Sequence, residues 1–197
     1  MKKILIIILI FNFSIIYSQK KEELFFLSNK VGFSEYSLEN NFKLNALNYS
    51  VNIGKEFNLN KSYSVLTSLG LDNYYFNVNE NSDNLYIKTK FVNLPIGIRI
   101  YTSKVDSSRF YSGLSIVNKY KIDESIENFA ESIETKGENG YNLGGFAEFG
   151  YRTTIKENLD FYIGLEFYSD LLQSGYTNKT IINNQINLII GIDVFKK

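Results

Sequence analysis

Charged side chains recur at alternate positions within strand-like stretches of this sequence. In "NLPIGIRIY" and "YNLGGFAEFGYRT", arginine and glutamate share one phase with asparagine and glycine, opposite a row of apolar residues. Seven residues of this kind are candidates for one site: Arg99, Glu148, Arg152, Glu166, Asp193, Glu56 and Asp72. If buried together, they could form a catalytic or ion-conducting cluster. They could also form a set of ion pairs that fills the interior, because buried charges need partners.

The composition excludes much enzyme chemistry. The chain has no histidine and no cysteine, which removes disulfides, most zinc sites, thiol nucleophiles and the commonest general base. No regular calcium-loop spacing is present, so we expect no metal, no cofactor and no catalytic residue. Lys plus Arg and Asp plus Glu both number 21, and this balance gives no net field that favours nucleic acid. The sequence does not predict an enzyme.

The first 18 residues have the pattern of a secretory signal peptide. Two lysines precede an apolar run over residues 4–16, and a small residue, Ser18, stands at a plausible cleavage point before Gln19. The run is shorter than the roughly 20 apolar residues of a membrane-spanning helix. We therefore predict cleavage between Ser18 and Gln19 and a single domain over residues 19–197.

Eight strand-like segments follow, rich in tyrosine, phenylalanine and β-branched residues. They are 28–38, 46–57, 62–76, 85–101, 109–121, 141–154, 160–171 and 181–195. Short polar connections alternate with longer ones, which include 77–84 and 123–140. Membrane barrels have short periplasmic turns and longer extracellular loops. The sequence therefore predicts an all-β, eight-stranded antiparallel up-and-down transmembrane β-barrel.

Glycine indicates which face of these strands points inward. Every strand carries a glycine on its more polar face: Gly32, Gly54, Gly70, Gly97, Gly113, Gly144 or Gly150, Gly164 and Gly191. The interior of an eight-stranded barrel is only just wide enough for side chains, and small residues there leave room for bulky neighbours. We therefore expect the polar face to line the interior, or lumen, and the apolar face to contact lipid. The closing segment "NLIIGIDVF" then directs Leu188, Ile190, Ile192 and Val194 outward and Asn187, Gly191, Asp193 and Phe195 inward.

Several local features fit this scheme less simply. Lys55 falls on the lipid face beside a turn, where it can extend to the interface, and Glu35 shares the outward phase of the first strand. Pro95 lacks a backbone N–H, so we expect a bulge or a local break there. Residues 123–140 place apolar residues at helical spacing and could form a short amphipathic helix.

Aromatic residues gather near the ends of the predicted strands. Phe57, Tyr63, Tyr101, Phe110 and Phe161 lie beside the short turns, and Tyr36, Tyr74, Tyr75, Tyr86, Tyr141 and Tyr168 lie beside the longer loops. Aromatic girdles mark both interfaces of membrane barrels, and we interpret the two groups in this way.

The stretch "KFVNLPIGIRIYTSKVDSSRFYSGLS", residues 90–115, resembles the PorT-like outer-membrane β-barrel proteins of Bacteroidota. The resemblance consists of an apolar strand with a central proline, a short polar turn and an aromatic-led strand with glycine. It implies an eight-stranded barrel in the outer membrane and a possible link to type IX secretion. It implies no catalytic residues.

We therefore expect an integral protein of the cell outer membrane with a structural, surface-interaction or secretion-accessory role. Its expected partners are outer-membrane lipid and other envelope proteins contacted through the loops, with the barrel itself monomeric. The alternative is a soluble periplasmic or secreted lipocalin-like barrel that binds a small ligand in an apolar cavity. A lipid-modifying enzyme is a third possibility, but no carboxylate, lysine or serine cluster is visible at the lipid-facing rim.

Overall fold

The computed structural model describes residues 23–37, 43–80, 83–103, 105, 107–128, 140–174 and 181–195. The expected signal peptide and its cleavage point at Ser18 and Gln19 lie outside the described residues. Among the described residues, no helix is long and apolar enough to cross a membrane.

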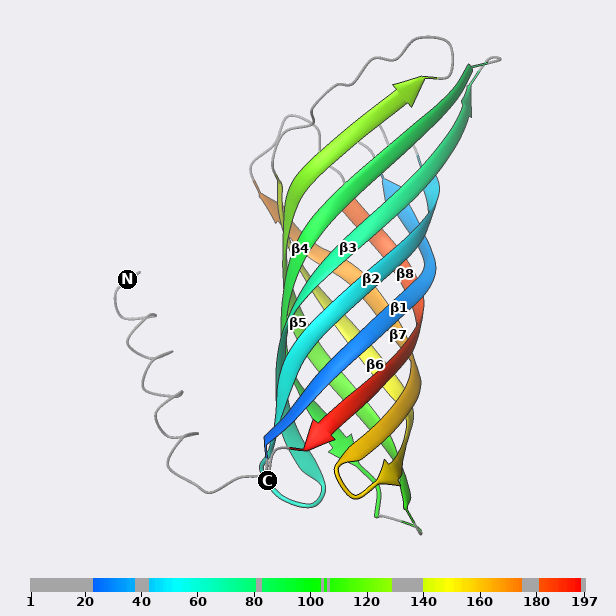
Figure 1. The fold of residues 1–197 in the computed structure, drawn as a ribbon. Helices are drawn as coiled ribbons and strands as arrows, with labels where there is room; N and C mark the ends of the chain where they lie inside the picture. The colour runs from blue at the N-terminus through cyan, green and yellow to red at the C-terminus, as the bar shows by residue number, and fades with distance from the viewer. Residues whose placement is uncertain are drawn as a thin grey trace, which may run out of the picture.

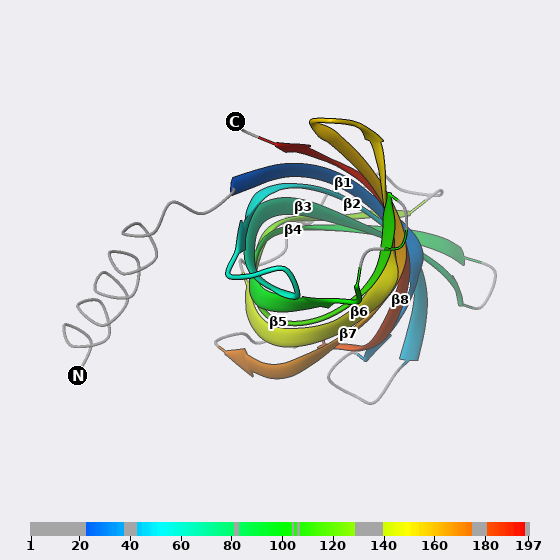
Figure 2. The ribbon, with the colours of Figure 1, turned by 90° about the horizontal axis from the view of Figure 1, so that it is seen from below.

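Eight antiparallel strands form a closed barrel in which each strand pairs with its neighbours in sequence, and β8 pairs with β1 (Figure 1). Viewed along its axis, the chain forms a complete ring (Figure 2). The strands are β1 Glu23–Ser37, β2 Lys43–Asn58, β3 Tyr63–Glu80, β4 Asp83–Tyr101, β5 Ser108–Asn128, β6 Gly140–Lys156, β7 Leu159–Ser174 and β8 Ile181–Phe195. The predicted fold class is confirmed.

The strands are staggered as well as closed. When the pairing is followed from Leu24 on β1 through the other seven strands, it returns to β1 at Ser34, ten residues further along. Such a stagger tilts the strands relative to the barrel axis, and closure requires this tilt. Figure 1 shows the tilt directly.

The two ends of the barrel differ. The connections β2–β3, β4–β5 and β6–β7 lie at one end, here called the turn end, together with the start of β1 and the end of β8. A short hydrogen-bonded turn joins β4 to β5, in which the amides of Val105 and Ser108 each donate to the carbonyl of the other residue. The opposite end is called the loop end.

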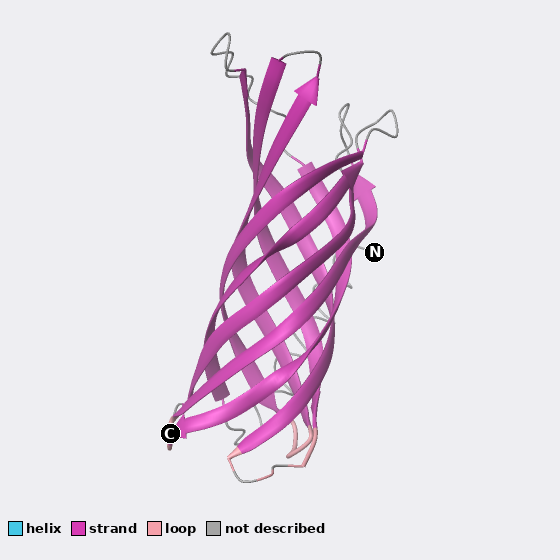
Figure 3. Cartoon of the chain, turned by 90° about the vertical axis from the view of Figure 1, so that its right-hand side faces the viewer, coloured by secondary structure: helices cyan, strands magenta, loops and turns pink. Residues whose placement is uncertain are grey.

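At the loop end, the predictions of two loops are partly wrong, because the strands run further than predicted. β3 and β4 continue through most of residues 77–84, and β5 continues to Asn128. These segments are polar because they extend beyond the apolar belt of the barrel. The helix expected over residues 123–140 is contradicted for 123–128, which is strand; residues 129–139 lie outside the described part of the chain. These three strands rise above the rest of the barrel (Figure 3).

Pro95 coincides with the expected local break. The β3–β4 ladder pairs Thr67 with Ile96 and Gly70 with Asn93 but has no partners between these pairs, whereas the β4–β5 ladder is continuous at Pro95. The register is unchanged across the gap. The missing N–H therefore interrupts one ladder without shifting the strand.

The outward face is an apolar belt. Large hydrophobic side chains are exposed on every strand, for example Val31, Ile53, Leu69, Ile96, Leu114, Phe149, Leu165 and Ile190. Outward charged side chains in the described strands lie near the ends: Glu23 and Lys55 toward the turn end, and Glu35, Lys88, Lys90 and Asp123 toward the loop end. Lys55 pairs there with Glu23, at 3.2 Å between Nζ and Oε2.

The girdle interpretation is correct for some aromatic residues and wrong for others. Tyr63 and Phe110 face outward near the turns, and the outward rings of Tyr75 and Tyr86 lie 6.2 Å apart near the loop end. Four residues assigned to the girdles point inward and are buried instead: Tyr36, Tyr74, Tyr101 and Tyr168. Proximity to a turn does not determine the face of a strand, because successive side chains alternate.

Candidate functional site

The lumen near the turn end holds a buried ion network centred on Glu56, which is completely inaccessible to solvent. Its Oε2 accepts hydrogen bonds from Arg99 Nη1 at 3.0 Å and from Arg152 Nη2 at 2.8 Å. Its Oε1 accepts hydrogen bonds from Ser64 Oγ, at 2.6 Å, and from the Tyr101 hydroxyl. One carboxylate from β2 thus joins side chains of β3, β4 and β6.

Arg99 joins this carboxylate to a second one. Its Nε and Nη2 donate to the two oxygens of Glu148, at 2.5 and 3.0 Å, in the two-pronged geometry that suits a guanidinium and a carboxylate. The Arg99 guanidinium also lies over the rings of Tyr111 and Tyr162, at 4.8 and 5.4 Å. Aromatic rings therefore contact the part of the Arg99 guanidinium that the carboxylates do not contact.

Arg152 extends the network to Asp193 on β8. Its Nε lies 2.9 Å from Asp193 Oδ2, within ion-pair distance. Neither atom has a hydrogen-bond partner, so the two groups form an ion pair without a hydrogen bond between these atoms. Asp193 pairs across the ladder with Asp160, which is also buried. At this end of the lumen, Asp193 and Asp160 are therefore less completely paired than Glu56.

A second polar group occupies the middle of the lumen. Lys30 Nζ pairs with Glu166 Oε2, and Asn187 Nδ2 donates to Glu166 Oε1 at 2.8 Å. Asn48 then donates to Asn187 Oδ1 at 2.6 Å and accepts from Ser34 Oγ at 2.8 Å. This chain of contacts joins four consecutive strands of the ring, β7, β8, β1 and β2.

Asp72 belongs to a third group, nearer the loop end. Its two oxygens contact Lys119 Nζ at 2.9 Å and Asn93 Nδ2 at 2.5 Å. Lys119 also lies 3.8 Å from the centre of the Tyr168 ring and donates to the Tyr74 hydroxyl at 2.6 Å. The lysine is thus enclosed by one carboxylate and two aromatic rings.

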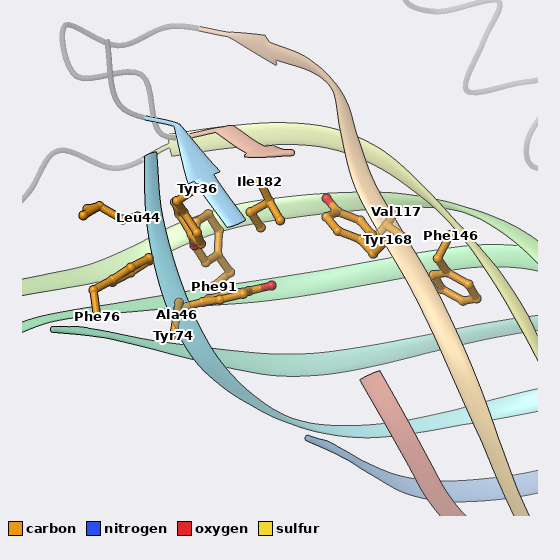
Figure 4. Close-up of a cluster of buried hydrophobic side chains, with 10 residues drawn as sticks. All are labelled: Tyr36, Leu44, Ala46, Tyr74, Phe76, Phe91, Val117, Phe146, Tyr168 and Ile182. Atoms are coloured by element: carbon orange, nitrogen blue, oxygen red, sulfur yellow. The ribbon is translucent and has the colours of Figure 1, made fainter. Parts of the chain in front are cut away.

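Aromatic and aliphatic side chains form a buried cluster in the lumen toward the loop end, where several of them contact the second and third groups. Figure 4 shows this cluster. Tyr36 packs edge-on against Tyr74 and Phe76, with ring centres 5.3 and 4.4 Å apart, and Phe91 packs against Tyr74 at 5.6 Å. The complete cluster is Tyr36, Leu44, Ala46, Tyr74, Phe76, Phe91, Val117, Phe146, Tyr168 and Ile182. The lumen is therefore partly apolar, where the sequence predicted a polar filling.

The inward glycines make room for these bulky side chains. A methyl group at Gly191 would overlap the ring of Tyr162, one at Gly164 would overlap the hydroxyl of Tyr111, and one at Gly144 would overlap that of Tyr168. Outward-facing Gly145 differs, because a methyl group there would meet only ordinary contacts. Space for tyrosine is thus the physical reason for several glycines on this face.

The cavities described in the lumen are small. Two cavities of about 20 and 10 Å³ adjoin Lys30, Pro95 and Phe146. A water molecule needs about 10–15 Å³ of such volume, so each cavity has room for about one. Among the described residues, no group of three or more acidic side chains is arranged to hold a metal ion. The arrangement suits a packed interior better than catalysis or conduction.

All seven predicted site residues are buried in the lumen, but they do not form one cluster. Arg99, Glu148, Arg152, Glu56 and Asp193 come together at the turn end, whereas Glu166 and Asp72 lie in separate groups. Sequence reasoning missed their lysine partners, Lys30 and Lys119. The available signal was the inward phase, since Lys30 is two residues from Gly32 and Lys119 is six residues from Gly113.

Comparison with known proteins gives a family and a fold. A family described as "Protein of unknown function (DUF3575)" matches residues 6–186, and no curated protein matches. Neisserial surface protein A (NspA) has a similar structure, with a TM-score of 0.58 at 12% identity over 87% of this chain and 96% of NspA. Outer membrane protein OprG from Pseudomonas aeruginosa is also similar, with a TM-score of 0.56 at 12% identity over 89% of this chain and 96% of OprG. At such identity the likeness concerns the fold, which is that of eight-stranded outer-membrane barrels.

Proposed function

We propose that this chain, which belongs to the DUF3575 family of proteins of unknown function, is an integral outer-membrane barrel whose packed lumen conducts nothing and whose loop end contacts other molecules. The family description names no activity. The proposal therefore rests on the distribution of polar and apolar side chains over the barrel.

One observation carries the membrane placement: the barrel is apolar outside and charged inside. Ile96 and Ile98 on β4 are about half exposed, while Arg99 beside them is buried among carboxylates. A charged side chain facing lipid at the bilayer midplane costs about 2–4 kcal/mol, and less near the interfaces. Outward charges near the strand ends fit this dependence on depth.

The same distribution disfavours a soluble lipocalin-like carrier. Such a barrel directs its apolar face inward around a ligand cavity and its polar face to water. Here the lumen contains ion pairs, amides and tightly packed rings, and the two described cavities each have room for about one water molecule. The same packing argues against an enzyme, since the cavities beside Glu148, Asp72 and Glu166 each have room for about one water molecule.

The loop end supports a role in surface interaction. β3, β4 and β5 extend there beyond their neighbours, whereas the turn end consists of short connections. Barrels of this class direct their larger loops away from the periplasm. We propose that the barrel is a monomer and that its loop end contacts other envelope or extracellular proteins.

A secretion-accessory role is a second candidate. It is supported only by the resemblance of residues 90–115 to PorT-like proteins of Bacteroidota, on which the outer-membrane assignment does not depend. Deletion of the gene, followed by measurement of type IX cargo in the medium, tests it. Unchanged secretion would remove this role and leave the membrane assignment intact.

Fractionation of the native host tests the proposed location. We expect the protein in the outer-membrane fraction, resistant to carbonate extraction, with a faster gel mobility before boiling than after. A soluble lipocalin-like barrel predicts recovery in the aqueous fraction without detergent. Recovery there would overturn the proposed function.

A further inference from the structure

Three strands form a sheet that projects from the loop end, here called the projecting sheet: residues 77–80 of β3, 83–90 of β4 and 122–128 of β5. The β3–β4 ladder continues to Glu80 and Asp83, and the β4–β5 ladder continues to Leu85 and Asn128. Figures 1 and 3 show this sheet rising above the remaining strands.

β5 has one edge in this sheet that lacks a partner strand among the described residues, here called the free edge. Its pairing with β6 ends at Lys121 and Gly140, so residues 122–128 pair with β4 alone within the described part of the chain. Seven extended residues at about 3.3 Å each give an edge about 23 Å long. A free edge presents unpaired N–H and C=O groups that can hydrogen-bond to another strand.

The free edge lacks two common protections against pairing. Lysine and proline often block exposed edges, but the segment "IDESIEN" contains neither. A register shift between Lys90 and Phe91 marks a bulge where the free edge begins, and beyond it the β4–β5 pairing is regular. The free edge is therefore a suitable template for an added strand.

The charge of the free edge indicates the kind of partner. Residues 122–128 include Asp123, Glu124 and Glu127 and no basic residue. Lys90 donates to Asp123 at 2.7 Å, which holds the pKa of this exposed carboxyl below its usual value and keeps it ionised. Lys121 pairs with Glu124 at 3.1 Å, so these lysines use one oxygen of each carboxylate.

We propose that the free edge of β5 binds an extended segment of a partner protein that carries lysine or arginine at alternate positions. The segment adds a fourth strand to the projecting sheet, with backbone hydrogen bonds for affinity and basic side chains for selectivity. A second copy of this chain fits poorly, because antiparallel pairing of two such edges would oppose acidic residues, which is destabilising. The proposal rests on the proposed function, in which the loop end faces outward.

Peptide binding to the full barrel in lipid nanodiscs tests this proposal. The probe is a labelled peptide of about ten residues that alternates threonine and lysine. In one modified version the odd-numbered residues carry N-methyl groups, and in the other the even-numbered residues do. Alternate amides of a strand point to opposite sides, so one version should bind about tenfold more weakly or worse, while the other binds like the parent. Asp123→Asn should also weaken binding, whereas Glu157→Gln, at the turn end, should not.

Hydrogen exchange supplies the second measurement. We expect the amides of residues 122–128 that point away from β4 to exchange rapidly in the barrel alone and slowly with the peptide. Equal affinity of both methylated peptides, no binding of the parent, or slow exchange without peptide would overturn the proposal. Nanodiscs expose both ends of the barrel, so these results do not depend on cellular location. Recovery in the aqueous fraction would instead overturn the proposed function alone.

Discussion

Replacement of Glu56 by glutamine tests the ion network most severely. The amide can still accept hydrogen bonds from Ser64 and Tyr101, so the change chiefly removes the charge that faces two arginines. Hydrogen bonds to charged groups contribute about 1.5–3 kcal/mol each, which gives about 3–6 kcal/mol for the two guanidinium contacts. Loss of one partner from a buried ion pair costs about 3–5 kcal/mol by direct measurement in other proteins. We therefore expect Glu56→Gln to lower the free energy of unfolding by about 3–5 kcal/mol.

Reversible urea unfolding of the barrel in lipid vesicles measures this loss, with circular dichroism and gel mobility as two readouts. Lys55→Ala is the matched control, because it breaks the Lys55–Glu23 pair, which is about one-third exposed. Exposed pairs contribute only about 0–1 kcal/mol. A loss below about 1 kcal/mol for Glu56→Gln, equal to that of the control, would refute the claim that this network stabilises the barrel.

The same unfolding assay tests two further features. Gly191→Ala should cost about 1–3 kcal/mol because the added methyl group overlaps Tyr162, whereas Gly145→Ala should change little; equal effects would contradict the packing of tyrosine on glycine. Ile96→Arg should cost about 2–4 kcal/mol or prevent insertion, whereas Ile155→Arg, beside a turn, should cost about 0–1 kcal/mol. Similar costs at both depths would argue against a bilayer around this belt.

The number and faces of the strands follow from the sequence because period-two alternation is a local property. In the closing strand, Ile190 and Ile192 face outward, and Gly191 and Asp193 face inward, as the alternation predicted. The inward glycines correctly indicated which face of the strands lines the lumen. Their physical basis, space for rings such as that of Tyr162, became visible only in the packed lumen.

The grouping of charged residues could not be predicted, because it depends on the stagger between distant strands. Glu56 and Arg152 are far apart in sequence, and their contact requires the tilt that returns the pairing from Leu24 to Ser34. The aromatic assignments failed for a different reason. Tyr74 and Tyr168 lie near the ends of the predicted strands, as girdle residues do, but their phase directs them inward.

The length of the strands was underestimated where their sequence is polar. Residues 77–84 contain asparagine and acidic residues that usually indicate a loop. β3 and β4 instead continue as paired strands to Glu80 and from Asp83. Polar sequence shows where a barrel strand leaves the apolar belt, and it does not show where the strand ends.

We infer that the apolar face of the barrel contacts lipid and that the polar face lines a packed lumen. The chain has no cysteine, so single cysteines can carry spin labels along β8 at Asn187, Leu188, Ile189 and Ile190. In lipid bilayers, labels at Leu188 and Ile190 should collide frequently with oxygen, which dissolves in lipid, and rarely with a water-soluble nickel complex. Labels at the inward positions Asn187 and Ile189 should collide rarely with either. The reverse alternation, or nickel contact at Leu188 and Ile190, would contradict the claim.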